Sequence, residues 1–236
     1  MKINLRKKVS NKKKYVPYTN NDKVTALLLN WKRQDNIVKV IQSIKDQTVD
    51  IKIWLWNNNI EDKTIYNVDV QINSSENFKC WPRWLIGSMV DEGYIFTLDD
   101  DIMFNKTNVI ENCLKHYKSI DLKKEFPIIG YSGVVLDDET GYWTSKHISN
   151  PIEDEDIKVD IVKGRFMFMD KNILSKVGLE NEPTCEDIKI SSYSNYKVLP
   201  SVIYNGLTNL EEGAEALHAS PEQREKRDIA TKKYFI

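Results

Sequence analysis

Three short apolar runs constrain the fold of this chain more than any other feature. They cover residues 24–29, 51–56 and 94–98. Apolar runs of this length predict strands whose two faces are covered by helices. The third run ends at three consecutive acidic residues, Asp99, Asp100 and Asp101. Ligands of open α/β sheets bind outside the carboxyl ends of the strands, so the triplet lies where a binding site is expected.

An amphipathic pattern joins the first two runs. Ile37, Val40, Ile41 and Ile44 recur at spacings of three and four, which predicts a helix, and Asp35 is placed to act as its N-cap. Two strands joined by a helix form a parallel pair. The alternation therefore predicts an α/β fold with a Rossmann-like, mainly parallel sheet flanked by helices.

Weaker patterns extend the alternation over the rest of the chain. They predict strands at residues 68–72, 128–136 and 157–169, helices at 82–90, 105–120 and 170–178, and a polar loop at 137–156. The last helix is the best marked, because Ser220 is placed as its N-cap and Pro221 at its first position, with an end near Tyr234. We expect one domain at residues 21–236 after a flexible basic tail at residues 1–20.

Bulk properties exclude several classes of protein. The formal charge of -1 gives no global attraction to nucleic acid or to an anionic membrane. No apolar run approaches the roughly 20 residues that span a bilayer, so we expect no transmembrane segment and a cytoplasmic location. Cys80, Cys113 and Cys185 are odd in number and widely spaced, which argues against disulfides and against a zinc site.

The acidic triplet has the composition of a site for a divalent cation. Residues two apart at the end of a strand point the same way, so Asp99 and Asp101 can face one metal ion while Asp100 faces elsewhere. A cation held by one or two carboxylates commonly binds the phosphates of a substrate. A solvated acidic turn is the alternative interpretation.

The order of several motifs adds a family resemblance. They are Asn30 and Arg33 after the first strand, WNN at residues 56–58, LDDDI at 98–102, CEDI at 185–188, and Arg227 ahead of Tyr234 and Phe235. With them the sequence resembles GT-A fold glycosyltransferases, and among these the exostosin-like family. The resemblance implies a metal-dependent transfer of a hexose or N-acetylhexosamine from a nucleotide-sugar, most readily a UDP-sugar, to a glycan or other hydroxyl acceptor. It also implies Mn²⁺ or Mg²⁺ as cofactor and retention of the anomeric configuration.

The resemblance assigns roles to individual residues. The donor nucleotide would be bound by Arg33, Asn57, Asn58, Asn77, Arg83, Asp99, Asp100 and Arg227, and the metal by Asp99, Asp101 and His218. The arginines suit this role because a guanidinium is a fixed fork of donors for phosphate oxygens. Asp187, with Glu186 beside it, resembles the catalytic carboxylate. It would orient the acceptor or steady a cationic sugar in a retaining enzyme, and act as general base in an inverting one.

Alternatives stay open at this point. An inverting family-2-type glycosyltransferase fits the same motifs. A sugar nucleotidyltransferase fits less well, because residues 30–36 contain no glycine to admit phosphates close to the backbone. A noncatalytic module that binds nucleotide or calcium would also use the acidic triplet. Animal exostosins have a membrane anchor and a large partner domain that are not found here, so a bacterial or viral cytoplasmic enzyme is expected. We place the acceptor site in residues 137–163; the sugar and the oligomeric state stay open.

Overall fold

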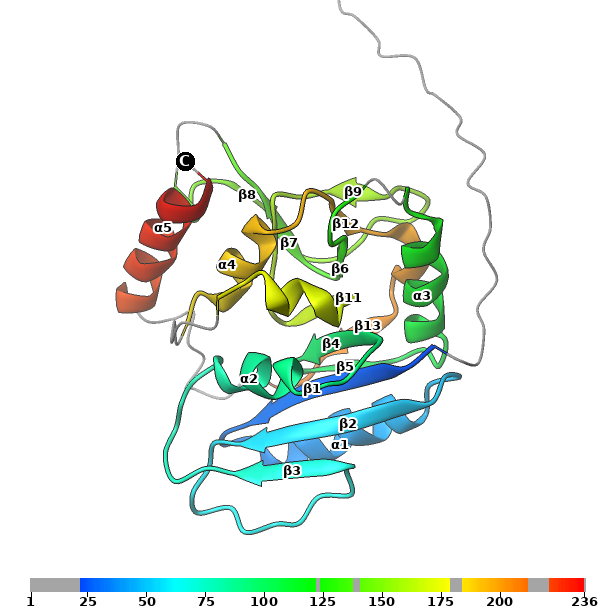
Figure 1. The fold of residues 1–236 in the computed structure, drawn as a ribbon, viewed down its shortest axis with the longest axis vertical. Helices are drawn as coiled ribbons and strands as arrows, with labels where there is room; N and C mark the ends of the chain where they lie inside the picture. Colours follow the sequence, from blue (N-terminus) through cyan, green and yellow to red (C-terminus); the bar gives the residue numbers. More distant parts are fainter. Residues whose placement is uncertain (1–21, 122–123, 138–140, 179–183, 212–220, 236) are drawn as a thin grey trace, which may run out of the picture.

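The computed structural model describes residues 22–121, 124–137, 141–178, 184–211 and 221–235 (Figure 1). The predicted tail at residues 1–20, the Ser220 cap and His218 lie outside these ranges. Among the described residues, none of the helices is both long enough and apolar enough to cross a bilayer.

The first half of the chain forms the predicted parallel sheet. Its elements are β1 (Val24–Asn30), α1 (Gln34–Lys45), β2 (Ile51–Asn57), β3 (Val70–Asn73), α2 (Pro82–Ser88) and β4 (Tyr94–Leu98). β1 pairs in parallel with both β2 and β4, and β3 extends the sheet beyond β2. The helix α1 begins at Gln34 with Arg33 at the N-cap position, so the expected cap at Asp35 is wrong. Asp35 lies instead in the first turn, where the helix dipole favours a negative charge.

The second half extends this sheet and adds two small ones. The large sheet has the order β3-β2-β1-β4-β11-β6-β12-β9, in which β11 and β9 are the antiparallel strands. Its added strands are β6 (Ile128–Gly130), β9 (Ile157–Lys158), β11 (Phe166–Asp170) and β12 (Lys197–Leu199). The small sheets combine β10 (Ile161–Val162) with β7 (Gly133–Val135) and β8 (Lys146–Ile148), and β13 (Leu207–Asn209) with β5 (Ile102–Phe104). The remaining helices are α3 (Val109–Ser119), α4 (Glu186–Ser192), α5 (Pro221–Phe235) and two short 3-10 helices, Lys171–Ser175 and Ser201–Ile203.

Several boundaries differ from the sequence prediction. The strand expected at residues 128–136 is two strands, β6 and β7, because the chain leaves the large sheet for a small one. The strand expected at 157–169 is likewise split into β9, β10 and β11, and β8 lies within the expected loop at 137–156. The helix expected at 170–178 is the short 3-10 helix Lys171–Ser175, and Asp170 is its N-cap, since its carboxylate accepts a hydrogen bond of 2.8 Å from the amide of Asn172.

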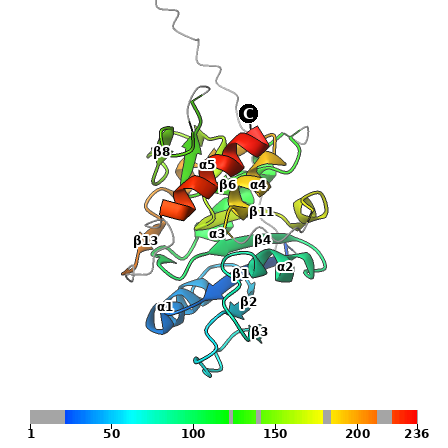
Figure 2. The ribbon, with the colours of Figure 1, turned by 90° about the vertical axis from the view of Figure 1, so that its left-hand side faces the viewer.

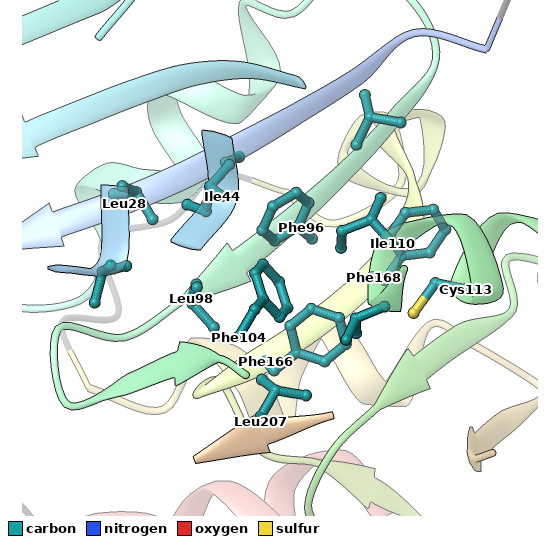
Figure 3. Close-up of a cluster of buried hydrophobic side chains, with 14 of the residues drawn as sticks. Leu28, Ile44, Phe96, Leu98, Phe104, Ile110, Cys113, Phe166, Phe168 and Leu207 are labelled. Carbon is teal, nitrogen blue, oxygen red and sulfur yellow. The ribbon is translucent and has the colours of Figure 1, made fainter. Parts of the chain in front are cut away.

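The two faces of the large sheet pack against different helices. On one face α1 and α3 cover alternate residues of β1 and β4, with Phe96, Phe104 and Phe166 at mutual ring distances of 5.9 Å (Figure 3). On the other face α2 and α4 pack through Trp84 and Ile190. Burial of each such side chain contributes about 1.5–3 kcal/mol. Trp84 is thus fully buried against the sheet, and all three cysteines are free thiols.

Candidate active site

The site lies at the edge where β1, β2 and β4 end. In Figure 1 the arrowheads of β1, β2 and β3 point to the side of the molecule that also holds α5. Because β11 runs antiparallel to β4, the turn that enters β11 lies at this same edge. The amide of Asp99 accordingly donates a hydrogen bond of 3.1 Å to the carbonyl oxygen of Arg165. The beginning of one strand and the end of its neighbour therefore build the site together.

Arginines surround the acidic triplet. Arg33 donates through Nη1 to Asp100 Oδ1 at 2.5 Å and to Asp101 Oδ2 at 3.2 Å, and Arg165 donates to Asp101 Oδ1 at 3.1 Å. Asp100 and Asp101 therefore share Arg33 as a partner. The sequence had instead predicted that Asp100 would face away from Asp99 and Asp101. The reason is that the chain has left the strand at Leu98 and turns, so the two-residue repeat of a strand no longer applies.

Arg83 connects the triplet to the second acidic pair. Its side chain, on α2, is 2% exposed and donates to Asp99 Oδ1 at 2.5 Å and to Glu186 Oε1 at 3.0 Å. Room for this guanidinium comes from Gly164, where a Cβ would lie 2.7 Å from Arg83 Nη2. The buried Arg83 guanidinium therefore forms ion pairs with two carboxylates that are far apart in the sequence.

Asp187 is held by α5. Its Oδ2 accepts hydrogen bonds from Arg227 at 2.8 Å and from the amide of Gly164 at 3.1 Å, and its side chain is 6% exposed. Arg227 also donates to the Tyr142 hydroxyl at 2.8 Å and lies 4.3 Å from the centre of that ring. Figure 2 shows α5 alongside α4, the helix whose first turn carries Asp187. The last helix thus completes the surroundings of this carboxylate.

Burial and the arginines set the charges of the site. Burial raises the pKa of Glu186 to about 6 despite the Arg83 guanidinium. Burial acts in the same sense on Asp187, but the charge and hydrogen bond of Arg227 outweigh it, so the pKa of Asp187 lies below its usual range. Burial, together with the charge of Asp99, raises the pKa of Asp101. At neutral pH Asp187 is therefore a carboxylate firmly paired with a cation.

The asparagines expected to bind nucleotide lie near this edge, but their amides are engaged. Asn57 is fully buried and its Nδ2 donates to the carbonyl oxygen of Asp62 at 3.0 Å. Asn58 donates to the carbonyl oxygen of Lys79 at 2.9 Å, and Asn77 accepts from the amide of Lys79 at 2.9 Å. These side chains shape the segment that follows β2.

The triplet offers hard oxygen ligands but no complete metal site. No group of three or more histidine, cysteine, aspartate or glutamate side chains gathers as a metal site in the part of the chain that the structure describes. The Asp99 side chain is 31% exposed, whereas both carboxylate oxygens of Asp101 form ion pairs with arginines. Two carboxylates completed by phosphate oxygens suit Mg²⁺ or Mn²⁺. The residues fit such a cation, which would compete with Arg33 and Arg165 for Asp101.

Sequence reasoning missed three residues of the site. Arg165 and Lys163 precede β11, and Tyr142 lies in the segment assigned to acceptor binding without a role of its own. The run Lys163-Gly164-Arg165 ahead of an apolar strand is a signal that could have been noticed. It becomes informative only once β11 is known to be antiparallel.

Structural comparison identifies similar proteins. The chain superimposes on TarS 1–349 from S. aureus in complex with UDP-GlcNAc with a TM-score of 0.61 and 11% identity, covering 84% of this chain and 61% of that one. The mannosyltransferase PcManGT from Pyrobaculum calidifontis, in complex with GDP-Man and Mn²⁺, gives 0.61 and 10% identity over 94% of this chain and 66% of that one. The chain thus spans less than two thirds of either chain.

These likenesses show the fold. The chain has the GT-A-like, mixed and mainly parallel α/β fold of glycosyltransferases. No protein-family model matches the sequence, and a search of curated proteins gives no match.

Proposed function

We propose that this protein is a metal-dependent glycosyltransferase that moves a sugar from a nucleotide-sugar, most readily a UDP-sugar, to a hydroxyl group of a glycan. The observation that carries the proposal is the pairing of Arg33, Arg83 and Arg165 with the acidic triplet at the carboxyl end of β4. Two of the three Asp carboxylates and the guanidiniums offer ligands for a cation and donors for phosphates within one edge of the sheet. The ligands in the similar structures, UDP-GlcNAc and GDP-Man, are nucleotide-sugars.

Donor binding follows from the arginine forks. The planar fork of a guanidinium donates two hydrogen bonds to a pair of phosphate oxygens, so Arg33 and Arg165 can release Asp101 and bind a phosphate of the diphosphate instead. Asp99 and Asp101 would hold the divalent cation, which neutralises charge on the diphosphate when bound. Asn57 and Asn58 act indirectly, because they fix the segment after β2 that borders the nucleotide.

In the reaction the bond between the anomeric carbon and the phosphate oxygen breaks, and its electron pair stays on the phosphate. The acceptor oxygen forms the new bond to carbon, and its proton passes to a base. Asp187 is a poor general base, since its low pKa and its bond to Arg227 keep it ionised and engaged. A role in orienting the acceptor or steadying positive charge on the sugar suits it better. This favours retention, as in the exostosin-like family, with the proton going to the departing phosphate.

The first experiment is donor hydrolysis in a panel. The purified protein is incubated with Mn²⁺ and UDP-, GDP- and CMP-sugars, and free nucleotide is measured beside Asp101→Asn. We expect metal-dependent release from one donor, lost in the variant and abolished by a chelator.

Three other results would contradict the proposal or a part of it. Absence of both release and nucleotide binding for every donor would refute it and leave a different role for the triplet. Nucleotide binding with no turnover in the presence of any acceptor would favour the noncatalytic module. Release from many donors without metal dependence would remove the proposed role of Asp99 and Asp101.

A further inference from the structure

Lys163 is a cationic side chain of the site that has no role in the mechanism proposed above. It lies in the turn that enters β11, and its side chain is half-buried. Among the residues that the structure describes, its ammonium group makes no hydrogen bond and no ion pair. A half-buried ammonium loses part of its hydration and here gains no partner in return, which costs free energy. Such a group needs an explanation.

The charged groups near Lys163 do not supply it with a partner. Burial lowers the pKa of Lys163, and the Arg227 and Arg165 guanidiniums act in the same sense, while Asp187 opposes them. Asp187 does not pair with Lys163, since its oxygens accept from Arg227, from the amide of Gly164 and from the amide of Ile188. Lys163 therefore lies beside one engaged carboxylate and two like charges.

The backbone holds Lys163 rigidly in this place. Its amide donates to the carbonyl oxygen of Ser132 at 2.9 Å. The next residue, Gly164, donates to Asp187 and accepts at 2.8 Å from the Thr97 hydroxyl. The backbones of Lys163 and of the residue that follows it are thus held by hydrogen bonds, and the side chain starts from a fixed point.

Unused donors accompany this lysine. Arg83, Arg165 and Arg227 each keep a buried Nε–H that has no acceptor among the described residues. Their other nitrogens bind Asp99, Asp101 and Asp187. Buried guanidinium donors without acceptors are rare in folded proteins, so the described acceptors of this site do not satisfy all of its cationic donors.

We propose that Lys163, near Arg165 and Arg227, binds the phosphate of the nucleotide-sugar that becomes the leaving group. The inference rests on the proposed function and deepens it. When the bond to the sugar breaks, negative charge grows on that phosphate oxygen, and a preplaced ammonium donates a hydrogen bond to it. The cost of keeping Lys163 without a partner in the free protein is offset when the diphosphate arrives.

Calorimetric titration without metal tests the inference at neutral pH. The probes are UDP, inorganic pyrophosphate and uridine, and the proteins are wild type, Lys163→Ala, Lys163→Arg and the control Lys39→Ala, an exposed lysine on α1. We expect Lys163→Ala to lower the affinity for UDP and for pyrophosphate about tenfold or more, as for loss of a charge-assisted hydrogen bond. Its affinity for uridine should be unchanged. Lys163→Arg should retain most of the affinity, and Lys39→Ala all of it.

Thermal unfolding separates binding from a structural role. Removing a half-buried charge without a partner should leave the midpoint of Lys163→Ala equal to or above that of wild type. A lower midpoint, or equal binding of UDP and pyrophosphate by Lys163→Ala and wild type, would overturn the inference and leave the proposed function standing. If wild type binds pyrophosphate through Lys163 but binds no nucleotide even when Mn²⁺ is added, the proposed function fails and the anion site stands. If wild type binds neither UDP nor pyrophosphate, with or without Mn²⁺, both are refuted.

Discussion

Arg227 and Asp187, 40 residues apart in the sequence, are joined by a hydrogen bond of 2.8 Å between α5 and α4. Replacing Arg227 by Met would leave a buried carboxylate without its cation, and we expect a loss of about 3–5 kcal/mol in the free energy of unfolding. Chemical denaturation measures it. Arg224→Met is the matched control, since Arg224 lies exposed on the same helix, with its guanidinium carbon 5.4 Å from the centre of the Trp143 ring. Adding Asp187→Asn to Arg227→Met should recover part of the loss; full additivity would contradict the pairing.

A methyl group at Gly164 should disturb Arg83. The added Cβ would lie 2.7 Å from Arg83 Nη2, and this guanidinium cannot move without breaking its bonds to Asp99 or Glu186. We expect Gly164→Ala to lose about 1–3 kcal/mol of stability, as in other overpacked interiors, and to bind nucleotide more weakly. Gly178→Ala is the control, because no atom of the described residues lies within 4 Å of the position of its Cβ. Equal melting midpoints for the two variants would show that Arg83 tolerates the methyl group.

Replacing Asp187 by Asn tests its part in the reaction. Nucleotide affinity should persist, since the proposed donor contacts come from other residues, while turnover should fall by about 10²–10³-fold, as when a group aimed at developing charge is lost. NMR of the product formed by wild type reports its anomeric configuration, and we expect retention. An inverted product would restore Asp187 as the general base despite its bond to Arg227.

His147 should make the protein less stable in acid. Burial lowers its pKa from 6.5, and the charges of Lys163 and Arg227 act in the same direction. A depressed pKa means that the unfolded chain binds the proton more readily, so the stability from neutral His147 is present above pH 6.5 and is lost as the pH falls below it. His147→Gln can keep the hydrogen bond to the Tyr142 carbonyl oxygen but does not titrate. Denaturation at pH 7.5 and 5.5 should show a smaller decrease for the variant; equal decreases would exclude His147 as the cause.

The sequence predicted those parts of the fold that depend on local pattern. β1, α1, β2 and β4 have continuous apolar runs or a helical repeat, and both parallel pairings of β1 follow from them. The region after Gly130 was misjudged, because a run such as residues 128–136 has the same pattern whether it forms one strand or turns into a second sheet. Tertiary pairing with distant strands decides between the two.

The acidic residues of the candidate site could be proposed from the sequence, but their contacts could not. The apolar run before it placed the acidic triplet at a strand end, the family resemblance suggested Asp187, and the structure brings Arg33, Arg83 and Arg227 to these residues. No spacing in the sequence indicates that Arg165 reaches Asp101, since that contact depends on the antiparallel direction of β11. Burial also decides which asparagine amides are engaged internally, and burial is a property of the whole fold.

The position of Arg227 on the last helix has a consequence for synthesis on the ribosome. The strands that carry the acidic triplet and the helix that carries Asp187 are all made before α5. Until α5 leaves the ribosome, Asp187 lacks its cation and must be hydrated or protonated where the finished protein holds it dry. The nascent chain can therefore form its sheet first, and Asp187 acquires its cation only once α5 has emerged.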